Sequence, residues 1–193
     1  QTLDTYFHDT YFVVGHFHYT LAASMLLGAF ACVYYWFPKM FGRKLSTGLA
    51  NLHFWLTLMF LNVVFMGMMR VGLAGHMRRI ADPNSYEFLR PLQNWQEIMA
   101  WGTVALGASQ LIFVINVVWS LFKGAPAGDN PWESTTLEWA APTPPPHGNF
   151  TSPLTAARGP YELSHPDVKD RDWIGQWEDG SSTIASAPQE GAL

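Results

Sequence analysis

Two histidines stand two positions apart in an apolar stretch of this sequence. His16 and His18 flank Phe17 between Thr10 and Pro38, a window without Asp, Glu, Lys or Arg. Ionisable side chains in such a stretch are costly to bury and are usually functional. Two α-helical positions correspond to a rotation of roughly 200°, so the imidazoles are expected on nearly opposite faces. A single shared metal ion is disfavoured, because it requires a spacing of three or four.

Two separate centres, one on each side of a helix, fit this spacing better. Imidazole is an axial ligand of haem iron, and a haem can fill the space between helices. We therefore expect His16 and His18 to bind two haems that straddle one helix, separated by Phe17 and the backbone. Gly15 would leave room for a flat ring, which favours this interpretation. The alternative is two buried histidines that are hydrogen-bonded to neighbouring helices.

A second polar pair, His8 and Asp9, lies about two turns earlier, roughly 12 Å along the axis from His16. A hard cation such as magnesium takes oxygen ligands and keeps waters when protein ligands are few. Adjacent His and Asp residues at a helix start can equally cap the helix. Taken alone, the pair favours the cap.

Three long apolar segments of the sequence are expected to form the helices that position these side chains. Residues 10 to 38, 45 to 69 and 98 to 122 contain no Asp, Glu, Lys or Arg. Each exceeds the about 20 residues that cross a bilayer as a helix. We predict an all-α membrane protein with three transmembrane helices. This composition argues against a compact soluble enzyme. It also argues against a nucleic-acid-binding protein, which needs a basic surface.

The last part of the chain differs in composition. Residues 123 to 193 hold ten of the thirteen prolines and ten of the fifteen acidic residues, against four basic ones. Because proline favours extended backbone, we expect a Pro-rich tail that lies on neighbouring protein. The predicted domains are a transmembrane haem-binding segment, 1 to 123, and this tail, 124 to 193. The single cysteine excludes an internal disulfide framework.

Charges between the windows predict the orientation. The connection 38 to 44 carries Lys39, Arg43 and Lys44 and no acid, so the positive-inside rule places it and the tail in the cytoplasm. The connection 70 to 97 then lies outside, although its arginines outnumber its acids. Either a bound anion neutralises some of these arginines, or they are solvated.

The run HDTYFVVGHFHY, residues 8 to 19, resembles the signature of subunit 1 of the haem-copper oxidases, in the branch that contains cytochrome c oxidase. The resemblance covers roughly the first 150 residues and implies the last three helices of a twelve-helix subunit. We therefore expect a piece of a larger or split subunit. The other matching positions are Trp36-Phe37-Pro38, Asn62, Gly72-Leu73-Ala74-Gly75, Arg78-Arg79, Asn116-Val117-Val118-Trp119-Ser120, Leu137-Glu138-Trp139, Pro144-Pro145-Pro146 and Asn149-Phe150.

The resemblance implies a role for each matching site residue. His16 would be the axial ligand of the high-spin haem, where oxygen is reduced, and the catalytic residue of this chain. His18 would be one of two axial ligands of the low-spin haem, with Phe17 against the cofactors. His8 and Asp9 match the outer magnesium site.

Three further positions match groups near the haem propionates. Asp4 matches an acid near the propionates of the high-spin haem, and Arg78 and Arg79 match the pair that holds propionates. A guanidinium suits a carboxylate better than lysine does, because its fork can donate two parallel hydrogen bonds.

The resemblance also implies cofactors, partners and a location. The cofactors are two haems of the haem A type, a copper ion held by residues outside this chain, and magnesium. The partners are the remaining helices of subunit 1, the copper-bearing subunit 2, subunit 3, cytochrome c as electron donor, and membrane lipid, but no nucleic acid. The location is the bacterial plasma (inner) membrane. The implied activity is proton-pumping reduction of dioxygen to water by reduced cytochrome c, and it requires the other helices and subunits.

Other functions are alternatives. A quinol oxidase of the same superfamily would retain both histidines, but the intact His8-Asp9 pair argues against it. In nitric oxide reductase iron replaces the copper, and the tail resemblance argues against that enzyme. A non-catalytic di-haem membrane anchor would bind no carbon monoxide, because both of its haems are six-coordinate.

Two short segments depart from the family pattern. Gly67, Met68 and Met69 stand where the family commonly has Pro-Gln-His, and His76-Met77 replaces the usual Met-Pro before the arginine pair. We therefore expect the connection after Met69 to differ in conformation or in partner contacts.

Overall fold

The computed structural model describes residues 2, 4–150, 153–159 and 174–177, and every regular element in these ranges is helical. Three helices are long and apolar enough to cross a membrane: Tyr11–Phe41, Thr47–Leu73 and Glu87–Lys123. The predicted all-α membrane protein with three candidate spans is confirmed. Each helix ends later than its predicted window, at Phe41, Leu73 and Lys123.

The chain forms two compact units, and each is described by itself. The first contains residues 1–35 and 45–124, and the second contains residues 36–44 and 125–193, within the described ranges. The predicted domain boundary after residue 123 stays a prediction.

The first span contains a π-helical segment. Helix α2 (Tyr11–Phe17) continues into the π-helix η1 (His18–Ala23) and then into α3 (Ser24–Phe41). π-Helical turns are rare and occur frequently at functional sites. Here the change of helix type begins at His18.

Thr10 starts helix α2. Its hydroxyl oxygen accepts a hydrogen bond from Phe12 N at 3.2 Å and donates one to Phe7 O at 2.7 Å. The hypothesis that His8 and Asp9 cap the helix is therefore wrong. Asp9 precedes the cap and has a φ of 56°, in the left-handed region that Asp adopts more readily than most residues. This turn separates the short helix α1 (Asp4–Phe7) from α2.

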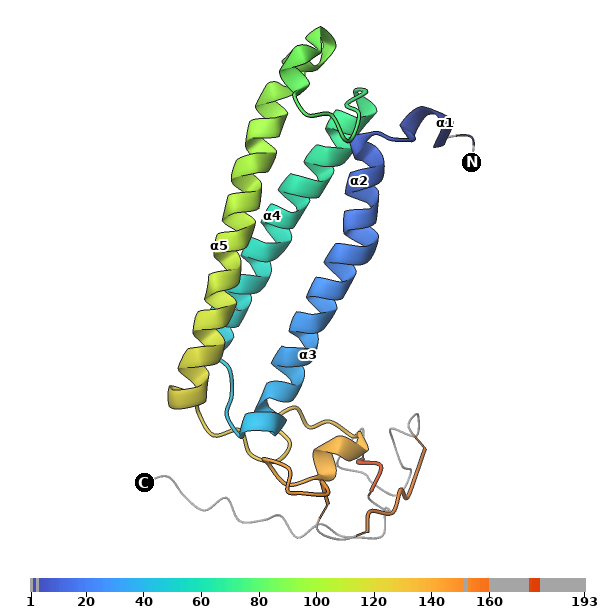
Figure 1. Ribbon diagram of the computed structural model, residues 1–193. Coiled ribbons are helices and arrows are strands. Elements are labelled where there is room, and N and C mark those ends of the chain that lie inside the picture. Colours follow the sequence, from blue (N-terminus) through green and yellow to red (C-terminus); the bar gives the residue numbers. More distant parts are fainter. Residues whose placement is uncertain (1, 3, 151–152, 160–173, 178–193) are drawn as a thin grey trace. The chain divides into compact units, whose positions relative to one another are not determined.

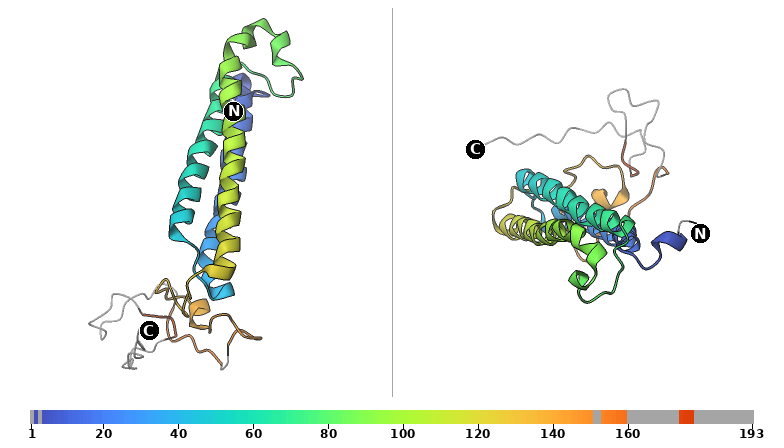
Figure 2. Two further views of the ribbon diagram at one scale, coloured as in Figure 1. Left: turned by 90° about the vertical axis from the view of Figure 1, so that its left-hand side faces the viewer. Right: turned by 90° about the horizontal axis from the view of Figure 1, so that it is seen from above.

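Helix α4 (Thr47–Leu73) is central in the first unit. It packs against α2 and against α5 (Gln93–Lys123), and these helices lie side by side in Figure 1 and Figure 2. Leu61, Val64 and Phe65 of α4 form an apolar cluster with Ala23 of η1. The 3-10 helices η2 (Pro83–Ser85) and η3 (Glu87–Leu92) precede α5. One helix therefore supports both the histidine-bearing segment and α5.

Two glycines of α4 permit close contact with its neighbours. A Cβ atom on Gly72 would lie 1.9 Å from Phe12 N, so α2 begins directly against this glycine. A Cβ atom on Gly67 would lie 2.6 Å from Met99 Cγ of α5. Gly67, which differs from the residue common in the family, therefore has Met99 packed directly against it.

Buried polar groups join the three helices near the start of α4. His53 is 2% exposed, and its ring nitrogens lie 3.1 Å from Tyr34 Oη on α3 and 3.1 Å from Gln110 Oε1 on α5. Asn116 bonds both the backbone N–H and the carbonyl of Ser46, at 2.9 and 3.0 Å. Paired in this way, the buried polar atoms avoid the cost of unsatisfied groups.

The second unit is built around Lys39. Its side chain is buried, and Nζ donates to Asp129 O at 2.8 Å and to Ala141 O at 2.5 Å. The same ammonium lies 5.2 Å from the ring centroid of Trp139, a buried residue of the 3-10 helix η4 (Leu137–Ala140). The start of the tail therefore folds back on the segment 36–44. That the tail also lies on neighbouring protein stays a prediction, and much of its second half lies outside the described residues.

Candidate functional site

His18 is held in one orientation by its own helix. Its Nδ1 atom lies 2.7 Å from the carbonyl oxygen of Val14, and a carbonyl only accepts, so Nδ1 carries the proton. The ring stacks on Phe17, with centroids 4.6 Å apart, and contacts Phe65 of α4 at 5.0 Å. This arrangement leaves Nε2 as the nitrogen with a free lone pair.

His16 has different surroundings. Its side chain is exposed and makes no hydrogen bond to any part of the chain that the structure describes, whereas His18 is half-buried against α4. The two imidazoles therefore have separate environments. Among the described residues, no group of three or more His, Cys, Asp or Glu side chains could hold a metal ion.

Gly15 does not serve the purpose that the sequence suggested. A Cβ atom there would lie 2.8 Å from Met69 Cγ and 2.9 Å from Phe65 O, both on α4. The glycine therefore leaves room for a neighbouring helix and not for a flat ring. Met69 belongs to the segment 67–69, which differs from the family pattern. This residue therefore packs against Gly15.

The donor chemistry at this helix fits axial haem ligation. Metal-binding histidines usually donate their other ring N–H to a carbonyl or carboxylate, which fixes the tautomer and raises ligand basicity. His18 has this arrangement through Val14 O. His16 presents an exposed imidazole two positions earlier, so each histidine can serve one iron.

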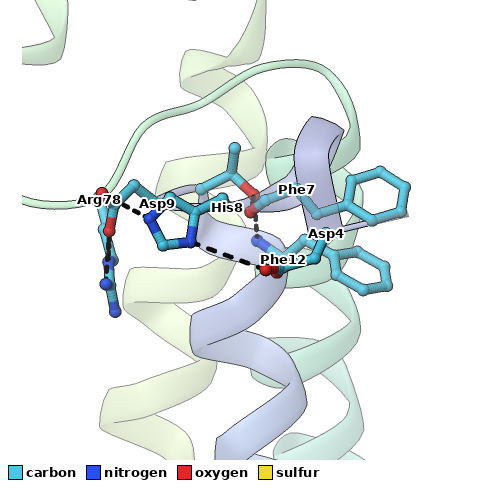
Figure 3. A network of polar contacts seen from close by, with 7 residues as sticks. Asp4, Phe7, His8, Asp9, Phe12 and Arg78 are labelled. Atoms are coloured by element: carbon cyan, nitrogen blue, oxygen red, sulfur yellow. Dashed lines mark hydrogen bonds and ion pairs between the residues drawn. The ribbon is translucent and has the colours of Figure 1, made fainter. Parts of the chain in front are cut away.

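His8 and Asp9 lie side by side beyond the start of α2. His8 Nε2 is 3.4 Å from Asp9 Oδ2, and His8 Nδ1 is 3.9 Å from Asp4 Oδ2 (Figure 3). Neighbouring ligands of an octahedral ion at about 2.1 Å from the metal are about 3.0 Å apart. The two donor atoms, 3.4 Å apart, are close to this spacing, and the assignment of a magnesium ion to the His8–Asp9 pair stays a prediction.

Arg78 is paired with the same carboxylate. Its Nε donates to Asp9 Oδ1 at 2.6 Å, Nη2 also pairs with Oδ1, and Arg78 N donates to Asp9 O at 2.8 Å (Figure 3). The hydrogen bond from Arg78 is the main cause that holds the pKa of Asp9 below its ordinary value. Arg79 is exposed and has a φ of 66°. The structure thus joins predicted metal and propionate residues in one network, and the contact of Arg78 and Arg79 with propionates stays a prediction.

Sequence reasoning assigned no role to His76 and Phe65. His76 is 2% exposed and bonds Gln96 of α5, and Phe65 packs on His18. His76 had a signal in the sequence, because it stands where the family commonly has methionine. Phe65 had none, because an aromatic residue in an apolar helix is usually packing material.

Comparisons with known proteins identify the family of this chain. Residues 1–107 match the family model of cytochrome c and quinol oxidase polypeptide I. Cytochrome c oxidase subunit 1 of Synechocystis sp. is 48% identical over 160 residues, which are 83% of this chain and 28% of the relative. The alternative cytochrome c oxidase subunit 1 of Bradyrhizobium diazoefficiens is 39% identical over 173 residues, 87% of this chain and 29% of that relative. Cytochrome c oxidase subunit 1 of Thermostichus vulcanus is 43% identical over 162 residues, which are 83% of this chain and 28% of that relative.

The chain spans somewhat more than a quarter of the length of these relatives, 28% and 29% for the first two. The family match covers more than half of the chain and includes the two histidines, the His8–Asp9 pair and the arginine pair. This chain therefore belongs to the cytochrome c and quinol oxidase polypeptide I family of haem-copper oxidases.

Proposed function

We propose that this chain is the C-terminal part of the catalytic subunit of a terminal respiratory oxidase that oxidises cytochrome c and reduces dioxygen to water with proton pumping. The observation that carries the proposal is the pair His16 and His18, two imidazoles with separate surroundings on one membrane helix. The relatives described above are named as cytochrome c oxidases, which supports cytochrome c as the donor.

In this proposal His18 would hold the low-spin haem through Nε2, and His16 would hold the high-spin haem. The Val14 carbonyl fixes the His18 tautomer, and Phe65 limits rotation of the ring. Phe17 lies between the two ligands and packs on His18. When bound, the haems, of the haem A type, and a copper ion held outside this chain supply the electron-transfer and oxygen chemistry.

The cluster beyond the start of α2 has a separate role in this proposal. His8 and Asp9 would supply two ligands to a magnesium ion, and Asp4, Arg78 and Arg79 would interact with haem propionates. Arg78 bonds Asp9 in the structure, which supports a shared cluster, because one guanidinium can connect the metal ligand to the propionates.

The proposed assembly is a twelve-helix subunit 1 with a copper-bearing subunit 2 and subunit 3, in the bacterial plasma membrane. The exposed apolar side chains of α3, α4 and α5 support contact with lipid and with the remaining helices. Lys39, Arg43 and Lys44 support a cytoplasmic location of the second unit, which contains the tail.

Ligand replacement in the complete oxidase tests the two haem roles. His18→Asn should remove the low-spin absorption band and retain the band shifted by carbon monoxide, and His16→Asn should remove the carbon monoxide shift. His147→Asn, at an exposed tail position, is the matched control and should leave both spectra unchanged.

Near-infrared magnetic circular dichroism of the unmodified oxidase identifies axial ligands without a variant, so a failure of assembly does not prevent the test. A low-spin haem with two imidazole ligands together with a carbon monoxide-binding haem supports the proposal. Two six-coordinate haems without carbon monoxide binding would show an electron-transfer anchor instead. Oxidation of a quinol and not of reduced cytochrome c would change the donor to a quinol.

A further inference from the structure

His76 lies where the second span leaves the bundle, in the turn that leads to the arginine pair. Its side chain is 2% exposed and has two hydrogen bonds. Nδ1 donates to Met77 O at 2.9 Å, since the carbonyl only accepts. Nε2 therefore accepts from Gln96 Nε2 of α5 at 2.7 Å. The neutral imidazole satisfies both nitrogens and ties the turn to α5.

The same turn is bonded to the start of α2. Tyr11 N donates to His76 O at 2.9 Å, and Thr10 and Met77 form an isolated antiparallel bridge. The His76 ring also meets the Tyr11 ring edge-on, with centroids 4.5 Å apart. These contacts tie the start of α2 to the 76–78 turn.

The next residue along the turn reaches the predicted metal ligands. Arg78 N donates to Asp9 O at 2.8 Å, and Arg78 Nε donates to Asp9 Oδ1 at 2.6 Å. Asp9 Oδ2 then lies 3.4 Å from His8 Nε2. A continuous set of contacts leads from Gln96 through His76 and Arg78 to the carboxylate of Asp9.

We propose that His76 is a positioning residue for the His8–Asp9 metal pair, and that it acts by tying the 76–78 turn to Gln96 of α5. The inference rests on the proposed metal-binding function of that pair. A methionine, which the family commonly has at this position, offers no N–H for the Met77 carbonyl and only a weak acceptor for Gln96. Histidine at position 76, in place of the methionine common in the family, therefore adds the hydrogen bond to Gln96.

The experiment uses the complete oxidase with Mn²⁺ in place of Mg²⁺ as a paramagnetic probe. Gln96→Leu removes the tie to α5 and leaves His76 in place. His76→Asn keeps an N–H donor for Met77 O but is too short to bond Gln96. Both variants should weaken the apparent Mn²⁺ affinity about tenfold and broaden the Mn²⁺ resonance, while the haem spectra stay unchanged.

Asn94→Leu is the matched control, because Asn94 is an exposed amide on the same helix and no contact joins it to His76. It should bind Mn²⁺ as the unmodified oxidase does. If Gln96→Leu and His76→Asn both keep the Mn²⁺ affinity and resonance of the unmodified oxidase, the positioning role of His76 is overturned. The proposed metal function of His8 and Asp9 would not be affected. An unmodified oxidase that binds no Mn²⁺ would overturn the proposed metal function of His8 and Asp9, and the inference with it.

Discussion

The contact between Gly72 and the start of α2 leads to a quantitative prediction about Gly72→Ala. A Cβ atom at this position would lie 1.9 Å from Phe12 N, 2.7 Å from Phe12 Cα and 2.7 Å from Tyr11 C. Real Cβ contacts essentially never fall below 3.0 Å, so the shortfall is 3.0 − 1.9 = 1.1 Å. All three atoms belong to the backbone, and no side-chain rotation can relieve the overlap. The start of α2 must therefore move away from α4.

The energetic cost follows from this displacement. Overpacking of this kind costs about 1–3 kcal/mol, and the hydrogen bond from Tyr11 N to His76 O, now 2.9 Å, contributes about 1 kcal/mol if it is lost. Alanine regains about 1 kcal/mol of helix propensity relative to glycine. The net expected destabilisation is about 2 kcal/mol.

Gly67→Ala is the matched control in the same helix. Its Cβ would meet Met99 Cγ at 2.6 Å and Met99 Sδ at 2.9 Å, which belong to a flexible side chain that can rotate away. The propensity gain of about 1 kcal/mol is the same and offsets the cost of moving the Met99 side chain, so the net effect should be close to zero.

Thermal unfolding of the complete oxidase in detergent, followed by far-ultraviolet circular dichroism, measures the difference. Gly72→Ala should lower the midpoint clearly, and Gly67→Ala should leave it near that of the unmodified protein. The reasoning is refuted if Gly72→Ala unfolds at the unmodified temperature, or if both variants lose the same stability.

Three further substitutions test other contacts. His53→Phe leaves two half-buried partners, Tyr34 and Gln110, without their bonds to the buried His53 ring and should cost about 1 kcal/mol or more, seen as a lower unfolding midpoint; an unchanged midpoint would contradict the assigned bonds. Arg78→Gln should raise the pKa of Asp9 toward its ordinary value of 3.8, seen by isotope-edited infrared titration of the carboxylate. Because the folded pKa of Asp9 is lowered, its stabilisation is complete above pH 3.8 and is lost as the pH falls through the folded pKa, and Arg78→Gln should reduce this dependence, since the charges of His8 and Arg79 also lower the pKa of Asp9. Lys39→Met removes the donor of two backbone carbonyls, so limited proteolysis of residues 125–143 should become at least about tenfold faster, and equal rates would contradict this role.

Some features of the site follow from local sequence alone. The three apolar windows predicted the spans, because a length of about 20 apolar residues is sufficient to recognise a membrane helix. The spacing of His16 and His18 predicted different helix faces, and the structure places only His18 against α4. The π-helix that begins at His18 was not predicted, because it depends on how the segment packs and not on its composition.

Two sequence interpretations were wrong for the same physical reason. His8 and Asp9 have the composition of a helix cap, but Thr10 caps α2 and Asp9 pairs with Arg78, 69 positions away. Gly15 has the size that a flat ring would need, but the space beside it is filled by α4. Residue type limits what a side chain can contact, and only the neighbouring helix decides what it does contact.

The sequence by itself determined the membrane class, the two candidate haem ligands, and the departures from the family pattern. These are properties of short segments, such as hydrophobicity, spacing and residue chemistry. Only the tertiary structure brought Gln96, His76, Arg78 and Asp9 into one network. The physical reason is that these contacts join α5, the turn after α4 and the start of α2. Their partners are set by helix packing, which no local pattern in the chain encodes.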